Sequence, residues 1–334
     1  MTAVAVGREQ VLRYRAHRQQ LDTKLPKADI ARAAHGGLQD SVPRGAVISL
    51  HARVRDVDPA SWEDPALAQI WFRGGTDYVI PRSDIGVFTL GSLPRDASVC
   101  ADLEEIADAA TRVLDGEVLK VREVADRMTL RHPLELRNAA RTGRLLIRWN
   151  ANMIWLIAND RPSIEPEVAR LELARRFLTW LGPQTRQRFA WWAAIEPKDA
   201  RATWDAIASE LVTVDVGGEE RSMLDRDLDA LVGAEPIEGV RLLPADDAFT
   251  KTHRDLLVTD DKKRSHAFPP IGTSPGYIPG AILVDGELAG VWQRQQRKVT
   301  IHPWRKLPKD EVEAEALSFP ISSTSKPSVR WEPS

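Results

Sequence analysis

The chain has 334 residues, 43% of them hydrophobic, and a formal net charge of −2. This length exceeds what one hydrophobic core usually holds, so we expect two or three domains. The single cysteine, Cys100, excludes an internal disulfide and a cysteine-based zinc site. No run of about 18 apolar residues is present, which predicts a cytoplasmic protein without a membrane span.

The charge is unevenly distributed along the chain. Residues 1–60 carry ten Lys or Arg against six Asp or Glu, and residues 119–148 carry eight against three. The remaining residues are therefore strongly acidic. Two basic segments on an acidic body are typical of a protein that presents one face to a polyanion. Solvated helix faces explain the same segments equally well, so charge alone leaves both interpretations open.

The first segment predicts three helices followed by a hairpin. The helices cover residues 7–21, residues 26–35 and a stretch from Val42 or Pro43 to about residue 55. Residues 70–72 and 76–80 then predict two strands around Gly74-Gly75. Helix, helix, helix, hairpin is the order of a winged helix-turn-helix, and we assign this first unit to residues 1–97.

A polar loop separates the second and third predicted helices. Gly36-Gly37 ends one helix, and Gln39, Asp40 and Ser41 precede the next. Free backbone N–H groups and the helix dipole at such a place suit a phosphate or a positioned water. A helix cap by Asp40 or Ser41 explains the same residue types, and spacing alone favours the cap.

The same order of elements recurs twice. The second unit, residues 98–162, has predicted helices at 102–114, 118–128 and 133–142 and strands at 145–149 and 153–157. The third unit, residues 163–235, has predicted helices at 166–181, 185–192 and 199–209 and strands at 211–216 and 219–224. Trp191 and Trp192 fall at helical spacing with Phe189, which favours core packing over a platform for stacking bases.

The second unit is the clearest winged helix. Its third helix would be the recognition helix, with Arg137 and Arg141, and the adjoining wing carries Arg144 and Arg148. Guanidinium groups suit phosphate oxygens or the major-groove edge of guanine. A winged helix that binds protein or serves as a scaffold is the alternative. The full set of candidate DNA-binding residues is Arg44, Arg73, Thr76, Arg131, Arg137, Arg141, Arg144 and Arg148.

The last third changes character. Residues 236–318 predict a small β-rich, barrel-like domain, with an Asp285-Gly286 hairpin turn and a short helix at 310–317. Residues 319–334, rich in Ser and Pro, predict a disordered tail. The fold class expected is mainly α with β, built from tandem winged helix-turn-helix repeats and this domain.

No metal or cofactor is expected. Asp246-Asp247 lacks a third ligand at suitable spacing, so a turn pair or packing role is favoured over a metal site. The chain contains no glycine-rich phosphate-binding motif of the nucleotide-binding kinds. We therefore expect no nucleotide cofactor.

Four stretches resemble the AlkZ-like winged-helix family. They are Gly37–Pro43, Phe72–Thr76, Leu181–Thr185 with Phe189 and Trp192, and Leu242–Asp247 together with the hairpin from Ile282 to Trp292. That family contains DNA glycosylases that unhook interstrand crosslinks and remove bulky N7-alkylated purines. We expect a monomer that binds double-stranded DNA and is associated with the nucleoid. The resemblance also implies a Gln-apolar-Gln or Gln-apolar-Asp catalytic motif before a helix.

This chain departs from the family motif. Aligned on Pro43 it reads Gln39-Asp40-Ser41, and Tyr78 stands where the family strand usually has a His. The resemblance implies that Gln39 orients the attacking water, with Asp40 as a helper if its carboxylate faces the lesion. Ser41 is a poor base without a partner. Two hypotheses stay open: a monofunctional DNA repair glycosylase, or a non-catalytic DNA-binding protein such as a regulator or lesion binder.

Overall fold

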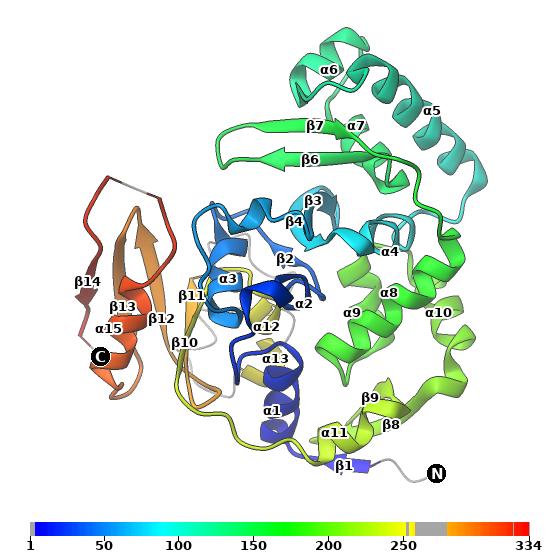
Figure 1. Cartoon of the computed structure of the whole chain (residues 1–334). Coiled ribbons are helices and arrows are strands. Elements are labelled where there is room, and N and C mark those ends of the chain that lie inside the picture. The colour runs from blue at the N-terminus through cyan, green and yellow to red at the C-terminus, as the bar shows by residue number, and fades with distance from the viewer. Residues whose placement is uncertain (1–3, 252–253, 258–278, 323, 334) are drawn as a thin grey trace.

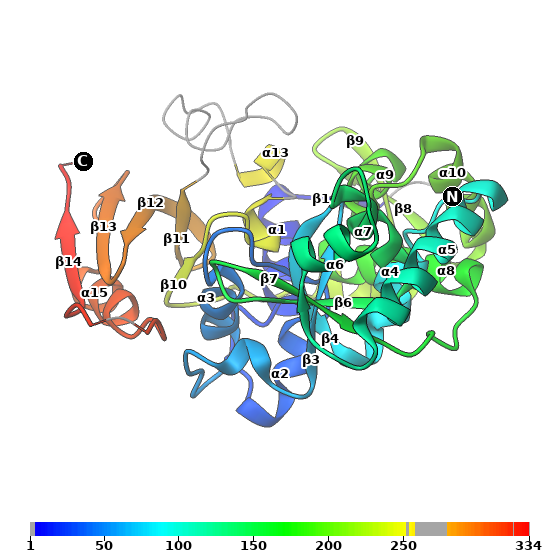
Figure 2. The ribbon, with the colours of Figure 1, turned by 90° about the horizontal axis from the view of Figure 1, so that it is seen from above.

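The structure is a computed structural model that describes residues 4–251, 254–257, 279–322 and 324–333. Figure 1 shows a mixed α/β architecture, with the C-terminal sheet at the left, α8–α10 of the third unit (residues 166–206) at the right and α5–α7 of the second unit (residues 97–139) at the top. The view from above in Figure 2 shows the C-terminal sheet at the left and the second and third units at the right. No helix among the described residues is long and apolar enough to cross a membrane.

The first unit contains four helices and a hairpin. Its helices are α1 (Arg8–Arg18), α2 (Ile30–Ala33), α3 (Gly45–Arg53) and α4 (Ile85–Leu90), and its strands are β2 (Leu38–Gln39), β3 (Leu67–Phe72) and β4 (Thr76–Pro81). Helix α3 begins later than predicted, because Arg44 before it has a left-handed φ of 66° and Pro43 lies outside the helix. The β3–β4 hairpin turns at Gly74 and Gly75 as predicted.

The second unit shares a sheet with the first. Its elements are α5 (Ala97–Leu114), β5 (Leu119–Lys120), α6 (Val121–Arg127), α7 (Leu134–Ala139), β6 (Leu145–Trp149) and β7 (Ile154–Ala158). Strand β6 pairs with β3 at Ile147 and Gln69, giving one six-stranded sheet in the order β2-β4-β3-β6-β7-β5. The sequence does not reveal this pairing, because an apolar strand does not mark which strand will be its neighbour.

The third unit encloses an aromatic core. Its elements are α8 (Pro166–Leu181), α9 (Arg186–Ala193), α10 (Pro197–Ala206), β8 (Leu211–Val216), β9 (Glu219–Leu224) and α11 (Leu228–Val232), and β1 (Val4–Val6) pairs with β8 in parallel. The rings of Phe177, Phe189 and Trp204 pack within 6.5 Å of one another. Trp192 is only 4% exposed, which confirms its predicted core role, whereas Trp191 is half-buried.

The C-terminal segment forms a separate sheet. Its elements are β10 (Val240–Leu243), α12 (Ala248–Lys251), α13 (Arg254–Leu257), β11 (Gly280–Val284), β12 (Glu287–Gln295), β13 (Lys298–Pro303), α15 (Lys309–Leu317) and β14 (Ser328–Trp331). The five strands lie in chain order from β10 to β14. Asp285 and Gly286 both have positive φ, 53° and 78°, as the predicted hairpin turn requires.

The chain end differs from the predicted disordered tail. Residues Ser328–Trp331 form β14, which pairs in parallel with β13. The indole of Trp331 also donates a hydrogen bond to Glu313 of α15 at 2.7 Å. Composition rich in Ser and Pro predicts disorder, but a short β-strand with one aromatic anchor overrides it here.

The chain just after α2 approaches α8 closely at Gly36. A Cβ atom at this position would lie less than 3.0 Å from the ring of Trp180, which is 2% exposed. Such overpacking typically costs about 1–3 kcal/mol. We therefore expect Gly36→Ala to lower the free energy of unfolding in urea by that amount. Gly7→Ala is the matched control, because no described atom lies within 4 Å of its Cβ position, and it should leave stability within about 1 kcal/mol. Equal stability of the two variants would contradict this packing.

Candidate active site

The polar loop is held as the edge of the six-stranded sheet. Leu38 and Gln39 pair with Val79 and Tyr78 of β4, and the Asp40 N–H donates to the carbonyl of Asp77 at 2.9 Å. The peptide before this strand turns at Gly37, whose φ of 76° places it in the left-handed region. The loop is therefore fixed by backbone bonds before any side chain acts.

Gln39 lies at the centre of a network of polar side chains. Gln39 is only 8% exposed. The amide oxygen accepts hydrogen bonds from the Tyr78 hydroxyl at 3.3 Å and from Lys251 Nζ at 2.6 Å. The amide nitrogen donates to Ser41 Oγ at 3.2 Å and to Asp246 Oδ2 at 3.3 Å. These four contacts fix the orientation of the carboxamide, and burial raises the pKa of Tyr78, which keeps its hydroxyl a donor.

Asp246 and Lys251 are site residues that the sequence reasoning missed. Lys251 Nζ lies 2.9 Å from Asp246 Oδ1, and both side chains remain partly exposed, at 16% and 21%. Asp246 adopts a left-handed φ of 63°. Its carboxylate contacts Gln39 and Lys251, whereas that of its neighbour Asp247 contacts Arg53. In the sequence, this segment stands out only as two acidic residues that follow a short apolar stretch. Its distance from Gln39 along the chain hid the contact.

Asp247 has the structural role that the sequence favoured for the pair. It forms a bidentate ion pair with Arg53 of α3, with both N···O distances 2.8 Å and both side chains fully buried. It also accepts from the Ser49 hydroxyl at 2.6 Å and from the Phe249 N–H at 3.0 Å. Burial alone would raise the pKa of Asp247, but the Arg53 guanidinium and these hydrogen bonds hold it below its usual value.

Asp40 faces the interior rather than the network around Gln39. Its side chain is fully buried; Oδ1 accepts from the Ala46 N–H at 2.9 Å, and Oδ2 lies 3.2 Å from Arg44 Nη1. Asp40 thus caps the N-terminus of α3 with its side chain, although Arg44 is the residue at the N-cap position. Burial raises the pKa of Asp40 to about 7, although the Ala46 N–H and the Arg44 guanidinium favour its charged form. Ser41, in contrast, is exposed.

The first-unit candidates for DNA binding lie in two places. The guanidinium of Arg44 stacks over Trp62 at 4.1 Å and donates to the carbonyl of Trp149 at 3.2 Å. Arg73 lies over the ring of Trp191 at 3.6 Å, and Thr76 bonds back to the Arg73 carbonyl at 3.3 Å. Arg44 is therefore beside Asp40, whereas Arg73 and Thr76 lie at the tip of the β3–β4 hairpin.

Most second-unit candidates have partners within the protein. Arg144 pairs with Asp108, and Arg148 pairs with Glu63 at 2.6 Å. Arg141 donates to the carbonyl of Ala194 at 3.5 Å, which is a weak contact. Arg137 lies 5.5 Å from the ring centre of Trp71, and Arg131 is exposed. The structure does not gather these five arginines around Gln39.

Among the described residues, no group of three or more His, Cys, Asp or Glu has the geometry to hold a metal ion. The side chains around Gln39 therefore offer an amide, a carboxylate, an ammonium and two hydroxyls. These are groups that could hold a water molecule by hydrogen bonds, and one of them is a carboxylate that remains partly accessible to solvent.

Comparisons with known proteins show which proteins this chain resembles in sequence and fold. The profile of the family described as "DNA glycosylase AlkZ-like" matches residues 32–319. A curated relative from Streptomyces sahachiroi, "Interstrand DNA cross-link repair glycosylase", is 24% identical over 92% of this chain and 94% of its own. The solved structure "Streptomyces sahachiroi DNA glycosylase AlkZ" has a TM-score of 0.77, with 22% identity, over 98% of this chain and 100% of that chain. This likeness shows the fold.

The raised pKa of Asp40 makes stability depend on pH. The folded protein keeps a proton on this carboxyl up to about pH 7, whereas the unfolded chain releases it at the ordinary pKa of 3.8. The free energy of unfolding therefore falls as pH rises through this window, by up to about 1.4 kcal/mol per pH unit. Asp40→Asn should flatten the profile measured by urea unfolding. The exposed Asp102→Asn should keep the slope of the unmodified protein, and a slope unchanged in Asp40→Asn would contradict the assignment.

Proposed function

The chain belongs to the AlkZ-like DNA glycosylase family, and from that premise we propose that it hydrolyses the N-glycosidic bond of alkylated or crosslinked purines in double-stranded DNA. The observation that carries the proposal is the network in which Gln39 bridges Ser41 and Asp246 beside Lys251. It holds the Ser41 hydroxyl and an accessible carboxylate on either side of the Gln39 amide, at the loop that resembles the family's catalytic motif.

The chemistry of this reaction suits a small catalytic set. A purine alkylated at N7 carries positive charge and leaves without strong acid catalysis. The site must place a water at C1′ of the sugar and stabilise an oxocarbenium-like transition state, a demand shared with sugar hydrolysis. A carboxylate can do both, as general base and as a negative charge near the developing cation.

We assign the carboxylate role to Asp246 in place of Asp40. Asp40 is fully buried and occupied by the Ala46 N–H and Arg44, so it does not reach a substrate in this arrangement. Asp246 is 21% exposed and uses one lone pair of each oxygen for Lys251 and Gln39, which leaves further lone pairs for a water.

Gln39 acts in this proposal through its N–H group. Its amide oxygen already accepts from Tyr78 and Lys251, so its remaining contribution is to hold the Asp246 carboxylate and the Ser41 hydroxyl on the two sides of one NH₂ group. A water between Asp246 and Ser41 would then be oriented by both. Lys251 fixes the other carboxylate oxygen and is a positioning residue.

The DNA-binding face belongs to the same proposal. We take the three helix-hairpin units as winged helices around the duplex, followed by the β-rich domain, in a protein that works as a monomer at the nucleoid. Arg73, Thr76, Arg131, Arg137 and Arg141 are the candidates left available for DNA, since Arg144 and Arg148 are ion-paired and Arg44 supports Asp40.

A non-catalytic DNA-binding protein is the second candidate. The inward orientation of Asp40, together with serine at the third motif position, favours it, because neither residue then supplies the base of the motif. The two functions differ in one observable, the formation of abasic sites in DNA that contains an alkylated purine.

The test is single-turnover excision from a duplex that contains N7-methylguanine, followed by detection of abasic sites. Asp246→Asn should slow excision by about 10²–10⁴-fold, the usual contribution of a positioned base. Gln39→Ala should also slow excision, because Asp246 and Ser41 lose the amide group that holds them. Asp40→Asn should keep most of the activity below about pH 7, where the carboxyl is already protonated.

The exposed Asp102→Asn is the matched control for a lost carboxylate and should excise at the rate of the unmodified protein. If the unmodified protein gives no more abasic sites than the Gln39→Ala, Asp246→Asn double variant, the glycosylase proposal fails and the non-catalytic function remains.

A further inference from the structure

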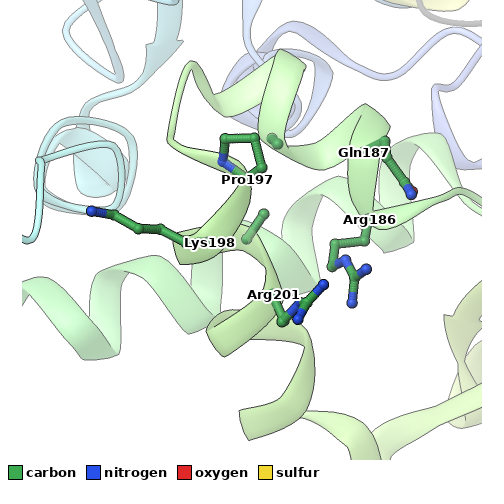
Figure 3. Close-up of a pocket in the computed structure, with 7 residues that line it drawn as sticks. Arg186, Gln187, Pro197, Lys198 and Arg201 are labelled. Atoms are coloured by element: carbon green, nitrogen blue, oxygen red, sulfur yellow. The ribbon is translucent and has the colours of Figure 1, made fainter.

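A pocket lies between helices α9 and α10 of the third unit. None of its lining residues belongs to the network around Gln39. Its volume is about 490 Å³, within the roughly 300–1,000 Å³ typical of ligand pockets. Three of its lining residues are cations, namely Arg186, Lys198 and Arg201. Figure 3 shows Arg186 and Arg201 on the same side of the pocket, while the side chain of Lys198 extends away from them. We call this cavity the α9–α10 pocket.

The charges of the pocket are not balanced by acids. No Asp or Glu lines it, and none of its three cations forms an ion pair within the part of the chain that the structure describes. The neighbouring helix α8 shows the usual arrangement instead: Arg175 pairs with Glu210 at 2.7 Å, and Arg176 pairs with Asp84. Guanidinium groups that line one pocket repel each other, and an anion bound in that pocket lowers this repulsion.

The floor of the pocket is apolar and small. Ala190 and Ala200 are buried, and Pro197 completes the apolar part of the lining. Among the described residues, no aromatic ring lines the pocket on which a base could stack. An apolar floor with a cationic rim matches a sugar and its phosphate rather than a base edge, because sequence is read by hydrogen bonds to base edges.

We propose that the α9–α10 pocket binds a phosphodiester of the DNA backbone, held by Arg186 and Arg201 with Lys198 at the flank. Contacts between cations and phosphates set the register of a protein on the duplex without reading its sequence. The proposal rests on the proposed function only for the identity of the polyanion, and it does not depend on the excision chemistry at Gln39.

Two contacts connect the pocket to the candidate DNA-binding face. The guanidinium of Arg73 lies 3.6 Å from the ring centre of Trp191 in α9. The carbonyl of Ala194, just after α9, accepts a hydrogen bond from Arg141. Helix α9 therefore contacts the β3–β4 hairpin of the first unit through Trp191. The residue just after the helix, Ala194, contacts the short helical turn at Ala140–Thr142 in the second unit. A duplex that touches Arg73 or Arg141 would meet the same helix that forms one wall of the pocket.

The test is the salt dependence of binding to an unmodified duplex by the intact protein. The triple variant Arg186→Gln, Lys198→Gln, Arg201→Gln should bind at least about tenfold more weakly at about 50 mM salt. Its slope of log K against log salt should become less negative by about 0.9 for each phosphate that the variant no longer neutralises, or roughly one to three units in all. Arg186→Lys, Arg201→Lys keeps the charge and should preserve most of the slope.

The matched control removes the same charge elsewhere. Arg305→Gln, Lys306→Gln, Lys326→Gln changes three exposed cations of the C-terminal segment, and its slope should stay that of the unmodified protein. Equal reductions of affinity in both triple variants would show a net-charge effect and overturn the proposal. An unchanged slope in the pocket variant would overturn it too, even if inorganic phosphate bound to the pocket in calorimetry.

Folding and excision are read out separately. Thermal melts identify a pocket variant that fails to fold, and the single variant Arg201→Gln, on an exposed position, then carries the test with a slope change of about one unit. Reduced duplex affinity in a protein without excision activity would leave the pocket proposal standing and refute the glycosylase alone.

Discussion

A buried ion pair between Arg53 and Asp247 connects the first unit to the C-terminal segment, and the arrangement of the candidate site depends on it. Both side chains are fully buried, and the pair is bidentate with two N···O distances of 2.8 Å. Removing one partner of such a pair typically costs about 3–5 kcal/mol, because the other charge stays buried without compensation. The carbonyl of Asp247 also accepts from the backbone N–H of Lys251 at 2.8 Å. The ion pair therefore places both Asp246 and Lys251 against Gln39.

The local elements were largely predictable from the sequence, because apolar periodicity and turn residues are local signals. Strands β6, β8 and β9 and helix α8 have the predicted bounds, and the turn at Asp285-Gly286 is the predicted one. The site was predictable only in part. Gln39 followed from the family motif, but Asp246 is more than 200 positions away along the chain, and no local pattern joins them. Whether Asp40 faces inward depends on a contact with Ala46, six residues on, which its residue type does not reveal.

The distribution of charge acquires a different meaning in three dimensions. In the second basic segment, residues 119–148, Arg144 and Arg148 form ion pairs with acidic residues of other elements. Arg186 and Arg201, which form no ion pair with any described residue, lie in the third unit. The linear charge count gave no signal there, because nearby acids such as Asp199 and Asp205 cancel it. A count along the chain cannot distinguish a cation that faces an acid from one that faces solvent.

The most direct test of the central claim replaces the buried pair without opening a cavity. The double variant Arg53→Met, Asp247→Leu exchanges the ion pair for apolar side chains, a change that buried pairs often tolerate without loss of stability. Its single-turnover excision rate is measured under conditions where circular dichroism shows it folded. The account predicts a rate reduced as far as that of Asp246→Asn, because Asp246 and Lys251 lose their anchor beside Gln39. A folded double variant that excises at the rate of the unmodified protein would contradict the account.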